Sequence, residues 1–224
     1  TDRPHYGNHI DWLKEKMDDL GVRVHLNTEG RIENVSKTNP DTILIAVGSS
    51  SDIADYTQNT EQFVMDADIL SGKVKIDRER KYVIYDREGQ MRAGSVANFL
   101  AKSGASSVEL ATPNWSVLED LDEIQKPEIY RLLAKYNVAM YPHKKLVENE
   151  HGKYAFKDRW TDVVNPIQED EIVVLVGYDE GDNTLLNFMT QSFPSVDVDI
   201  IGDALSPRGL AAAIAEAART AECI

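Results

Sequence analysis

The sequence is poor in the residues that mark metal centres and covalent catalysis. Its 224 residues include a single cysteine, Cys223, so the chain has neither an internal disulfide nor a cysteine-rich metal site. No Ser-His-Asp, Cys-His or paired-carboxylate spacing indicates a nucleophile. The histidines lack metal-ligand spacing and are expected at the surface or in loops. They are His5, His9, His25, His143 and His151. We therefore expect neither a catalytic side chain nor a metal site in this chain.

Positive charge is scarce as well. Lys and Arg number 24 against 38 Asp and Glu, which gives a net charge of −14, and no basic stripe offsets the acid. Because phosphate contacts need clustered cations, a nucleic-acid partner is not expected. The chain also lacks the ~20 consecutive apolar residues that cross a bilayer, and no signal segment opens it. These absences favour a cytoplasmic protein with no membrane contact.

The first part of the chain alternates helical and strand patterns. Apolar residues recur at helical spacing over residues 10–20, and Gly21 follows as a C-terminal cap. A short alternating strand is expected over Val22–Leu26. The apolar run Thr42–Val47 ends in Gly48-Ser49 and is typical of a buried parallel strand. Residues 52–75 are polar, with one short helix expected at Asp66–Leu70.

A second unit starts after the charged patch at residues 77–81. The pattern predicts a strand at Tyr82–Tyr85, a turn at Asp86–Gly94, a helix at Ser95–Ser103 and a strand at Ser107–Thr112. A strand, helix and strand within about 30 residues is the size of a parallel crossover.

The remaining pattern is again α/β. A helix is expected at Pro127–Tyr136, short antiparallel strands over residues 138–168, and a buried strand at Ile172–Val176. The last unit is a strand at Val198–Asp203 followed by a helix from Pro207. The alternation predicts parallel α/β sheets with sites at the carboxyl ends of the strands.

Gly202-Asp203 carries the strongest local signal. A strand that ends in Gly-Asp places a carboxylate at the sheet edge, where it can accept a hydrogen bond from a sugar or ribityl hydroxyl. The N-terminus of the helix after it favours a phosphate. Alternatively, Asp203 caps that helix. The spacing alone leaves both interpretations open.

These strand ends resemble those of flavoproteins with two dinucleotide-binding domains. The resemblance lies in Ile201-Gly202-Asp203, in the Gly209-Leu210 that follows it, and in the strand end Leu44–Ser49. More narrowly, the chain is similar to the C-terminal region of the 2,4-dienoyl-CoA reductase and trimethylamine dehydrogenase group, which is related to NADH:flavin oxidoreductases and old yellow enzyme. The similarity continues through residues 82–112 and 127–136 to Gly177-Tyr178.

The resemblance implies cofactors and their neighbours. In relatives, the two strand ends of the first domain lie against FAD or ADP; carried over, they assign Ala46, Gly48, Ser49, Gly202 and Asp203 to a cofactor site. Position 47 is Val, where relatives usually have Thr. The resemblance also implies a preceding barrel with FMN and an iron–sulfur cluster. The group's first Gly-x-Gly-x-x-Gly loop is not in this chain, so we do not expect tight FAD binding by this chain alone.

The second unit carries a degenerate Gly-rich turn. Gly89 and Gly94 are its two glycines and the candidate contacts to NAD(P)H or ADP. Glu88 would repel a phosphate, whereas Arg87 and Arg92 would attract one. The next strand ends in Ala111-Thr112 and lacks the acid that accepts the ribose 2′-hydroxyl. NAD(P)H binding therefore stays open. The three tryptophans, at positions 12, 115 and 160, are expected to anchor a core or an interface.

We predict two Rossmann-like domains, the first incomplete and interrupted by the second. Residues 1–75 and 180–224 form the FAD-type domain, and residues 76–179 form the inserted NAD(P)- or ADP-type domain. The chain is then the dinucleotide-binding portion of a flavin-dependent oxidoreductase, inactive alone, that serves electron transfer between nicotinamide and flavin. The alternatives are a separate subunit completed by a partner and a structural domain whose nucleotide sites have decayed. An exposed sheet edge would favour pairing with a second copy.

Overall fold

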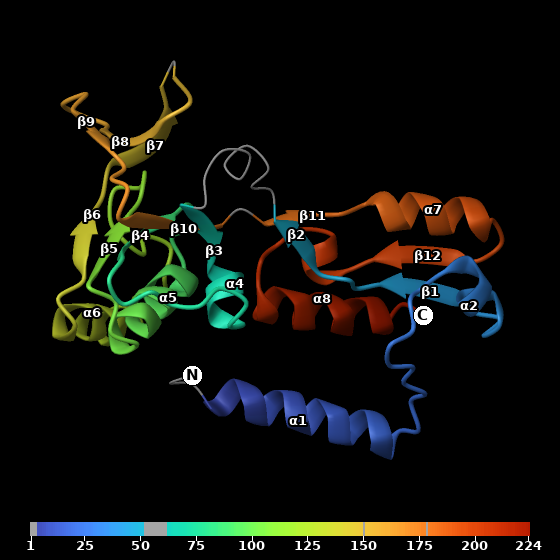
Figure 1. The fold of residues 1–224 in the computed structure, drawn as a ribbon. Helices are drawn as coiled ribbons and strands as arrows, with labels where there is room; N and C mark the ends of the chain where they lie inside the picture. Colours follow the sequence, from blue (N-terminus) through green and yellow to red (C-terminus); the bar gives the residue numbers. More distant parts are fainter. Residues whose placement is uncertain (1–3, 52–61, 150, 178) are drawn as a thin grey trace. The chain divides into compact units, whose positions relative to one another are not determined.

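The computed structural model describes residues 4–51, 62–149, 151–177 and 179–224. They form two compact units (Figure 1). Unit 1 comprises Thr1–Ser50 and Glu180–Ile224, and unit 2 comprises Ser51–Asp179. The chain passes between the units at β2 (Ser49–Ser51) and β11 (Asp179–Gly181), which pair with each other.

Unit 2 is built on a five-stranded parallel sheet in the order β3-β10-β4-β5-β6. The strands are β3 (Phe63–Met65), β4 (Lys81–Asp86), β5 (Ser107–Ala111), β6 (Ala139–Tyr141) and β10 (Glu171–Val176). The helices are α4 (Asp66–Leu70), α5 (Met91–Lys102) and α6 (Lys126–Lys135). This topology confirms the α/β fold with a parallel sheet.

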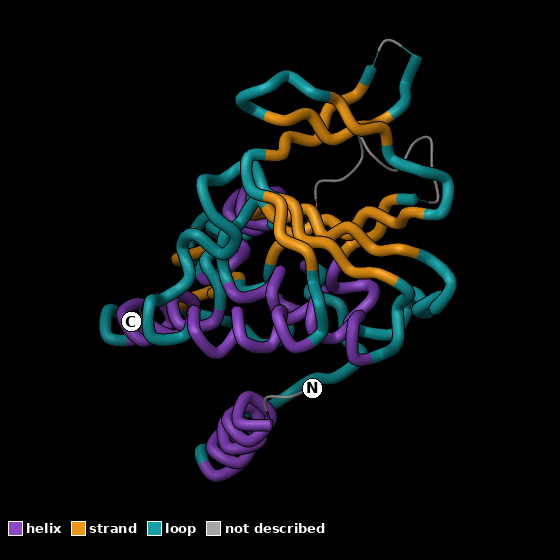
Figure 2. The backbone as a smooth tube through the Cα atoms, turned by 90° about the vertical axis from the view of Figure 1, so that its left-hand side faces the viewer, coloured by secondary structure: helices purple, strands orange, loops and turns teal. Residues whose placement is uncertain are grey.

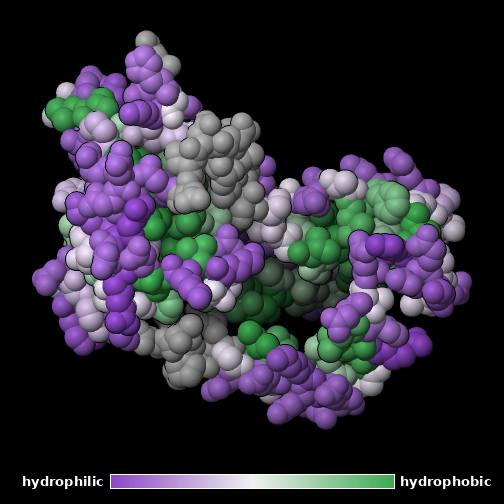
Figure 3. All heavy atoms as spheres, viewed as in Figure 1, coloured by the Kyte–Doolittle hydropathy of each residue, from purple (hydrophilic) through white to green (hydrophobic). Residues whose placement is uncertain are grey.

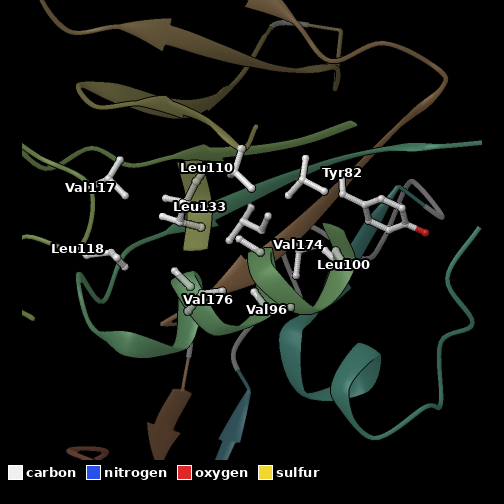
Figure 4. Packing of buried hydrophobic residues seen from close by; sticks show 14 of the residues in the cluster. Tyr82, Val96, Leu100, Leu110, Val117, Leu118, Leu133, Val174 and Val176 are labelled. Atoms are coloured by element: carbon white, nitrogen blue, oxygen red, sulfur yellow. The ribbon is translucent and has the colours of Figure 1, made fainter. Parts of the chain in front are cut away.

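The sheet is buried on both faces, as its continuous apolar strands predict. On one face, α5 and α6 pack against β4, β5 and β10, where Leu100, Leu110 and Val174 meet with no exposed surface (Figure 4). On the other face lies an antiparallel meander of β7 (Lys144–Glu148), β8 (Tyr154–Asp158) and β9 (Val164–Pro166). Figure 2 shows the sheet between the helices and this meander. Unit 2 therefore has a closed core.

The side chains of unit 1 are much less buried than those of unit 2. Its helices are α1 (Pro4–Asp19), α2 (Ile32–Ser36), α7 (Thr184–Ser192), the 3₁₀ turn η1 (Gly202–Ala204) and α8 (Leu210–Ala221). Its sheet has two parallel strands, β1 (Thr42–Ile45) and β12 (Asp197–Ile200). The buried cluster is Ile45, Met189, Ile200 and Ala204.

The apolar stripes of unit 1 stay open. Leu210 and Ile214 of α8 are 48% and 45% exposed, and Ile10 of α1 is 51% exposed. Figure 3 shows hydrophobic side chains at the visible surface around β1, β12 and α7. A two-stranded parallel sheet with half-exposed helices buries little apolar surface, so its own packing contributes little free energy.

Several sequence-based boundaries need correction. Val22–Leu26 forms no strand, because it has no partner strand to take its backbone hydrogen bonds. The segment at 139–141, expected to be antiparallel, is the parallel edge strand β6. Residues 62–75 were expected in the first domain; they lie in unit 2, because β3 pairs with β10. Strands β2, β3 and β11 and helix α7 were not predicted.

Two helix starts also differ from the expectation. Helix α5 begins at Met91 instead of Ser95, because Asp86 closes the turn after β4 within three residues. Helix α8 begins at Leu210 instead of near Pro207. There, Gly209 has φ of +82°, which is not helical, and its N–H donates to Asp203.

Candidate nucleotide site

Two candidate segments of unit 1 meet at one sheet edge. β1 and β12 run in parallel register to Ile45 and Ile200, and the N–H of Ile201 donates to the carbonyl of Ile45 (2.9 Å). Ala46 and Gly202 therefore follow neighbouring strands. The turn after β1 passes through Gly48 at φ +79°, a conformation that glycine adopts without strain, and leads into Ser49 of β2. The carboxyl edge thus gathers the predicted residues, as a doubly wound sheet requires.

The structure gives Gly202 and Asp203 local partners. The N–H of Gly202 donates to Glu216 Oε2 (2.7 Å), and Asp203 Oδ1 accepts from the N–H groups of Arg208 (3.0 Å) and Gly209 (3.1 Å). Arg208 also binds Glu216 (2.8 Å). The hydrogen bonds from Arg208 and Gly202 hold the pKa of Glu216 below its ordinary value. Asp203 therefore holds the turn that leads into α8 and does not cap the helix itself, whose N-cap residue Gly209 has no side-chain cap.

In unit 2 the turn after β4 is closed by its own carboxylate. Asp86 is fully buried, and its Oδ1 accepts from the N–H groups of Glu88 (3.0 Å) and Gly89 (2.9 Å). Asp86 Oδ2 has no hydrogen-bond partner among the described residues. Burial raises the pKa of Asp86 to about 6, against the two N–H donors, which lower it. Backbone donors that a Gly-rich loop offers to a pyrophosphate are thus directed at a side chain of the same loop.

Gly89 is covered by the loop after β5. A Cβ at Gly89 would lie 3.0 Å from Asn114 Nδ2 and 3.1 Å from Asp120 Oδ2. The N–H of Asp120 donates to the carbonyl of Gly89 (3.0 Å), and Gln90 Nε2 donates to the carbonyl of Asp120 (2.9 Å). This close approach explains why residue 89 is a glycine. It also places the carboxylate of Asp120 beside the turn.

Gly94 lies in the helix and not in the turn. A Cβ there would lie 2.6 Å from Ile129 Cγ2 and 3.2 Å from Leu118 Cδ1. Gly94 therefore lets α5 approach α6 closely. The structure gives it a packing contact, and its assignment as a cofactor residue stays a prediction.

Arg92, expected as a phosphate attractor, is engaged with carboxylates. It binds Asp66, the first residue of α4, through Nη2–Oδ1 (2.9 Å) and Nε–Oδ2 (3.1 Å), and it also pairs with Asp179. Glu88 Oε2 lies 3.7 Å from its Nε. Burial raises the pKa of Glu88, and the charge of Arg92 opposes that shift. Sequence reasoning missed this network, because Asp66 and Asp179 are far from Arg92 in the chain.

The exposed aromatic residues of unit 2 also converge. Trp115 and Trp160 are 62% and 59% exposed, so they are not core anchors. Their ring centroids lie 5.4 Å apart, and His143 lies 5.5 and 5.6 Å from them. Trp115, His143 and Trp160 each follow the end of a strand, which is the signal that could have grouped them. Trp12 is half-exposed on α1.

Over the described ranges, no helix is both long and apolar enough to cross a membrane. Nor do the His, Cys, Asp and Glu side chains of those ranges form a group that could hold a metal ion. Of the residues named from the sequence, Tyr178 lies outside the description, as does the side chain of His5.

Two curated proteins are similar to this chain. A probable N-methylproline demethylase of Rhizobium meliloti (strain 1021) is 32% identical over 129 residues, which are 58% of this chain and 19% of that protein. An NADH oxidase of Thermoanaerobacter brockii is 24% identical over 207 residues, which are 87% of this chain and 29% of that protein. The chain thus spans less than a third of either relative. No family model matches it.

Among solved structures, a 2-naphthoyl-CoA reductase in complex with 2-naphthoyl-CoA has the same fold, with a TM-score of 0.77 and 24% identity. The match covers 94% of this chain and 31% of that one. The resemblance to oxidoreductases, expected from the sequence, is confirmed by these relatives, and the chain shares its fold with part of the reductase structure.

Proposed function

We propose that this chain is the nucleotide-binding portion of a flavin-dependent oxidoreductase and serves electron transfer between a nicotinamide cofactor and a flavin. The observation that carries the proposal is the joint ending of β1 and β12, which brings Ala46 beside Gly202, in a chain similar to an NADH oxidase over 87% of its length. Ala46, Gly48, Ser49, Gly202 and Asp203 line the proposed FAD or ADP position of unit 1.

Unit 1 supplies only part of that site. The sequence contains no Gly-x-Gly-x-x-Gly loop, whose N–H groups bind the pyrophosphate. The half-exposed stripes of α1 and α8 and the open edge of the β1–β12 sheet are consistent with further structure packed on this unit. We propose that a barrel domain with FMN and an iron–sulfur cluster belongs to the same enzyme and carries the substrate chemistry.

Calorimetric titration of the chain with ADP, FAD, NADH and NADPH tests the proposal. We expect saturable micromolar binding of a nicotinamide nucleotide or ADP, and weaker binding of FAD. Asp203→Asn keeps Oδ1 for the turn and replaces Oδ2, so it should weaken ADP binding if unit 1 holds the ligand. An absence of heat with all four ligands would overturn nucleotide binding by this chain.

One observation favours a second candidate, a structural domain whose nucleotide site has decayed. Asp86 and Glu88 occupy the turn where a pyrophosphate would lie, and Asp86 takes two of the N–H donors. Such a domain would keep its fold and bind no nucleotide, with or without the rest of the enzyme. Titration of the enzyme that contains this chain, with the same four ligands, separates the candidates.

A further inference from the structure

The exposed aromatic residues of unit 2 form a surface that lacks a role in its packing. We use the name aromatic platform for the group Trp115, His143, Arg159 and Trp160. The Arg159 guanidinium lies 5.9 Å from the ring centroids of both tryptophans. Two indoles that are more than half exposed leave a large apolar area in water, and such patches mark binding sites.

The platform is fixed in place by the backbone. The N–H of His143 donates to the carbonyl of Asn114 (3.1 Å), and the N–H of Arg159 donates to the carbonyl of His143 (2.9 Å). Asp158 Oδ1 accepts from the N–H groups of Trp160 and Thr161, both at 2.9 Å. Three loops are therefore joined, and the rings need little ordering when a ligand binds.

Within the described ranges, the positive charge of Arg159 is not neutralised by a carboxylate. Its guanidinium donates to the carbonyl of Pro113 (3.5 Å), and within the described ranges it forms no ion pair, although the chain has an excess of carboxylates. In addition, His143 Nδ1 is buried and has no hydrogen-bond partner in those ranges. An arginine that lies beside two indoles keeps N–H groups available for an anion, and phosphate suits a guanidinium.

The position of the aromatic platform at the edge of the sheet indicates which class of ligand it binds. Trp115 follows β5 and His143 follows β6, at the carboxyl edge where α/β sheets bind ligands. In a dinucleotide-binding unit, the end of the second strand holds the adenosine ribose, with an acid for a free 2′-hydroxyl or an arginine for a 2′-phosphate. Here β5 ends at Ala111, and Thr112 is buried with its Oγ1 bound to the N–H of Asn114. The strand end itself therefore offers no carboxylate, and the one beside the platform, Glu119 Oε2, accepts from the N–H of Trp115 (3.0 Å).

We infer that the aromatic platform binds adenosine carrying a ribose phosphate, with the adenine on the indole faces and the ribose phosphate on Arg159. This inference rests on the proposed function and specifies its ligand. NADPH supplies such a group with a 2′-phosphate and coenzyme A with a 3′-phosphate. Because Asp86 and Glu88 oppose a pyrophosphate at the turn, the adenosine end supplies most of the affinity, and 2′,5′-ADP binds about as tightly as NADPH.

The test is titration of the full chain with 2′,5′-ADP, 3′,5′-ADP, 5′-ADP, NADPH and NADH, followed by calorimetry and tryptophan fluorescence. We expect one ribose-phosphate isomer to bind about tenfold more tightly than 5′-ADP, since one charge-assisted contact is worth about that factor. The better isomer identifies the source. Arg159→Gln should remove this preference and leave 5′-ADP unchanged, and Trp160→Ala should weaken all adenosine ligands.

Arg131→Gln is the matched control, because Arg131 is an exposed arginine of α6 paired with Glu128. It should change no affinity. Binding of 2′,5′-ADP and 3′,5′-ADP no tighter than that of 5′-ADP, and insensitive to Arg159→Gln, would overturn the inference and leave the proposed function standing. If no adenosine ligand binds, nucleotide binding by unit 2 fails together with the inference. If ADP still binds and Asp203→Asn weakens it, the site in unit 1 survives.

Discussion

Units 1 and 2 share an α/β construction and differ in how far each completes its core. Unit 2 surrounds five parallel strands with helices and a meander, and many of its apolar side chains have no exposed surface. The parallel sheet of unit 1 has two strands, and the described residues of this unit form a cluster of four buried side chains. The comparison indicates that unit 2 has the apolar burial of a free-standing domain, whereas the described residues of unit 1 bury little apolar surface of their own.

The largest expected effect contrasts one isoleucine in each unit. Ile84 in β4 is fully buried, and Ile45 in β1 is 4% exposed within the small cluster. Ile84→Ala should lower the free energy of unfolding of unit 2 by about 4 kcal/mol, because it leaves a cavity in a closed core. Ile45→Ala should have less than half that effect, because its surroundings can relax. Urea unfolding, followed by Trp115 and Trp160 fluorescence for unit 2 and by circular dichroism, measures both. Equal losses would remove the contrast between the units.

The second prediction concerns the ion pair between Arg92 of α5 and Asp66 of α4. Arg92→Met leaves Asp66, which is 2% exposed, without its bidentate partner. We expect a loss of about 3 kcal/mol, since an unpaired buried charge is destabilising. Asp66→Asn in the same chain should recover most of it, and a double-mutant cycle from urea unfolding gives the coupling. Strictly additive losses would show that the pair contributes through packing alone.

The third prediction is a pH dependence in unit 2. Burial raises the pKa of Asp86 from 3.8 to about 6, so the folded state binds its proton more tightly than the unfolded state. Its contribution to stability is complete below pH 3.8 and is lost as the pH rises through about 6, which corresponds to about 2–3 kcal/mol. Asp86→Asn should flatten this part of the curve of unfolding free energy against pH. Asp41→Asn, at an exposed position of unit 1, is the control and should leave the curve unchanged.

The same contrast explains what the sequence could predict. In unit 2 the apolar runs at 82–85, 107–111 and 172–176 predict strands, because burial on both faces demands continuous hydrophobicity. In unit 1 the alternation at Val22–Leu26 also satisfies the strand pattern, yet no strand forms, because local pattern cannot supply a hydrogen-bonding partner.

The site residues also divide into those that local sequence could predict and those that depend on distant segments. Gly48 and Gly202 could be predicted from strand ends, since a chain that leaves a parallel strand needs a turn there. The contacts of Arg92 and the gathering of the aromatic platform could not, because each joins segments distant in sequence. Asp86 could have been noticed as a carboxylate at a strand end, although its two N–H donors depend on the turn conformation.

The smallest effect is expected at Asp203, where the turn contacts and the proposed ligand contact meet in one side chain. Asp203→Ala removes the acceptor for the N–H groups of Arg208 and Gly209, so the turn that leads into α8 should lose about 1 kcal/mol. Faster hydrogen exchange of the amides of residues 208 and 209 measures this loss. Asp203→Asn retains Oδ1 and should exchange at the original rate. If Asp203→Asn also leaves ADP affinity unchanged, the residue only holds the turn before α8, and the assignment of this strand end to a cofactor loses its carboxylate. If the affinity falls while the exchange rate holds, the second oxygen serves the ligand, and the open unit keeps part of a nucleotide site that the closed unit has filled with its own side chains.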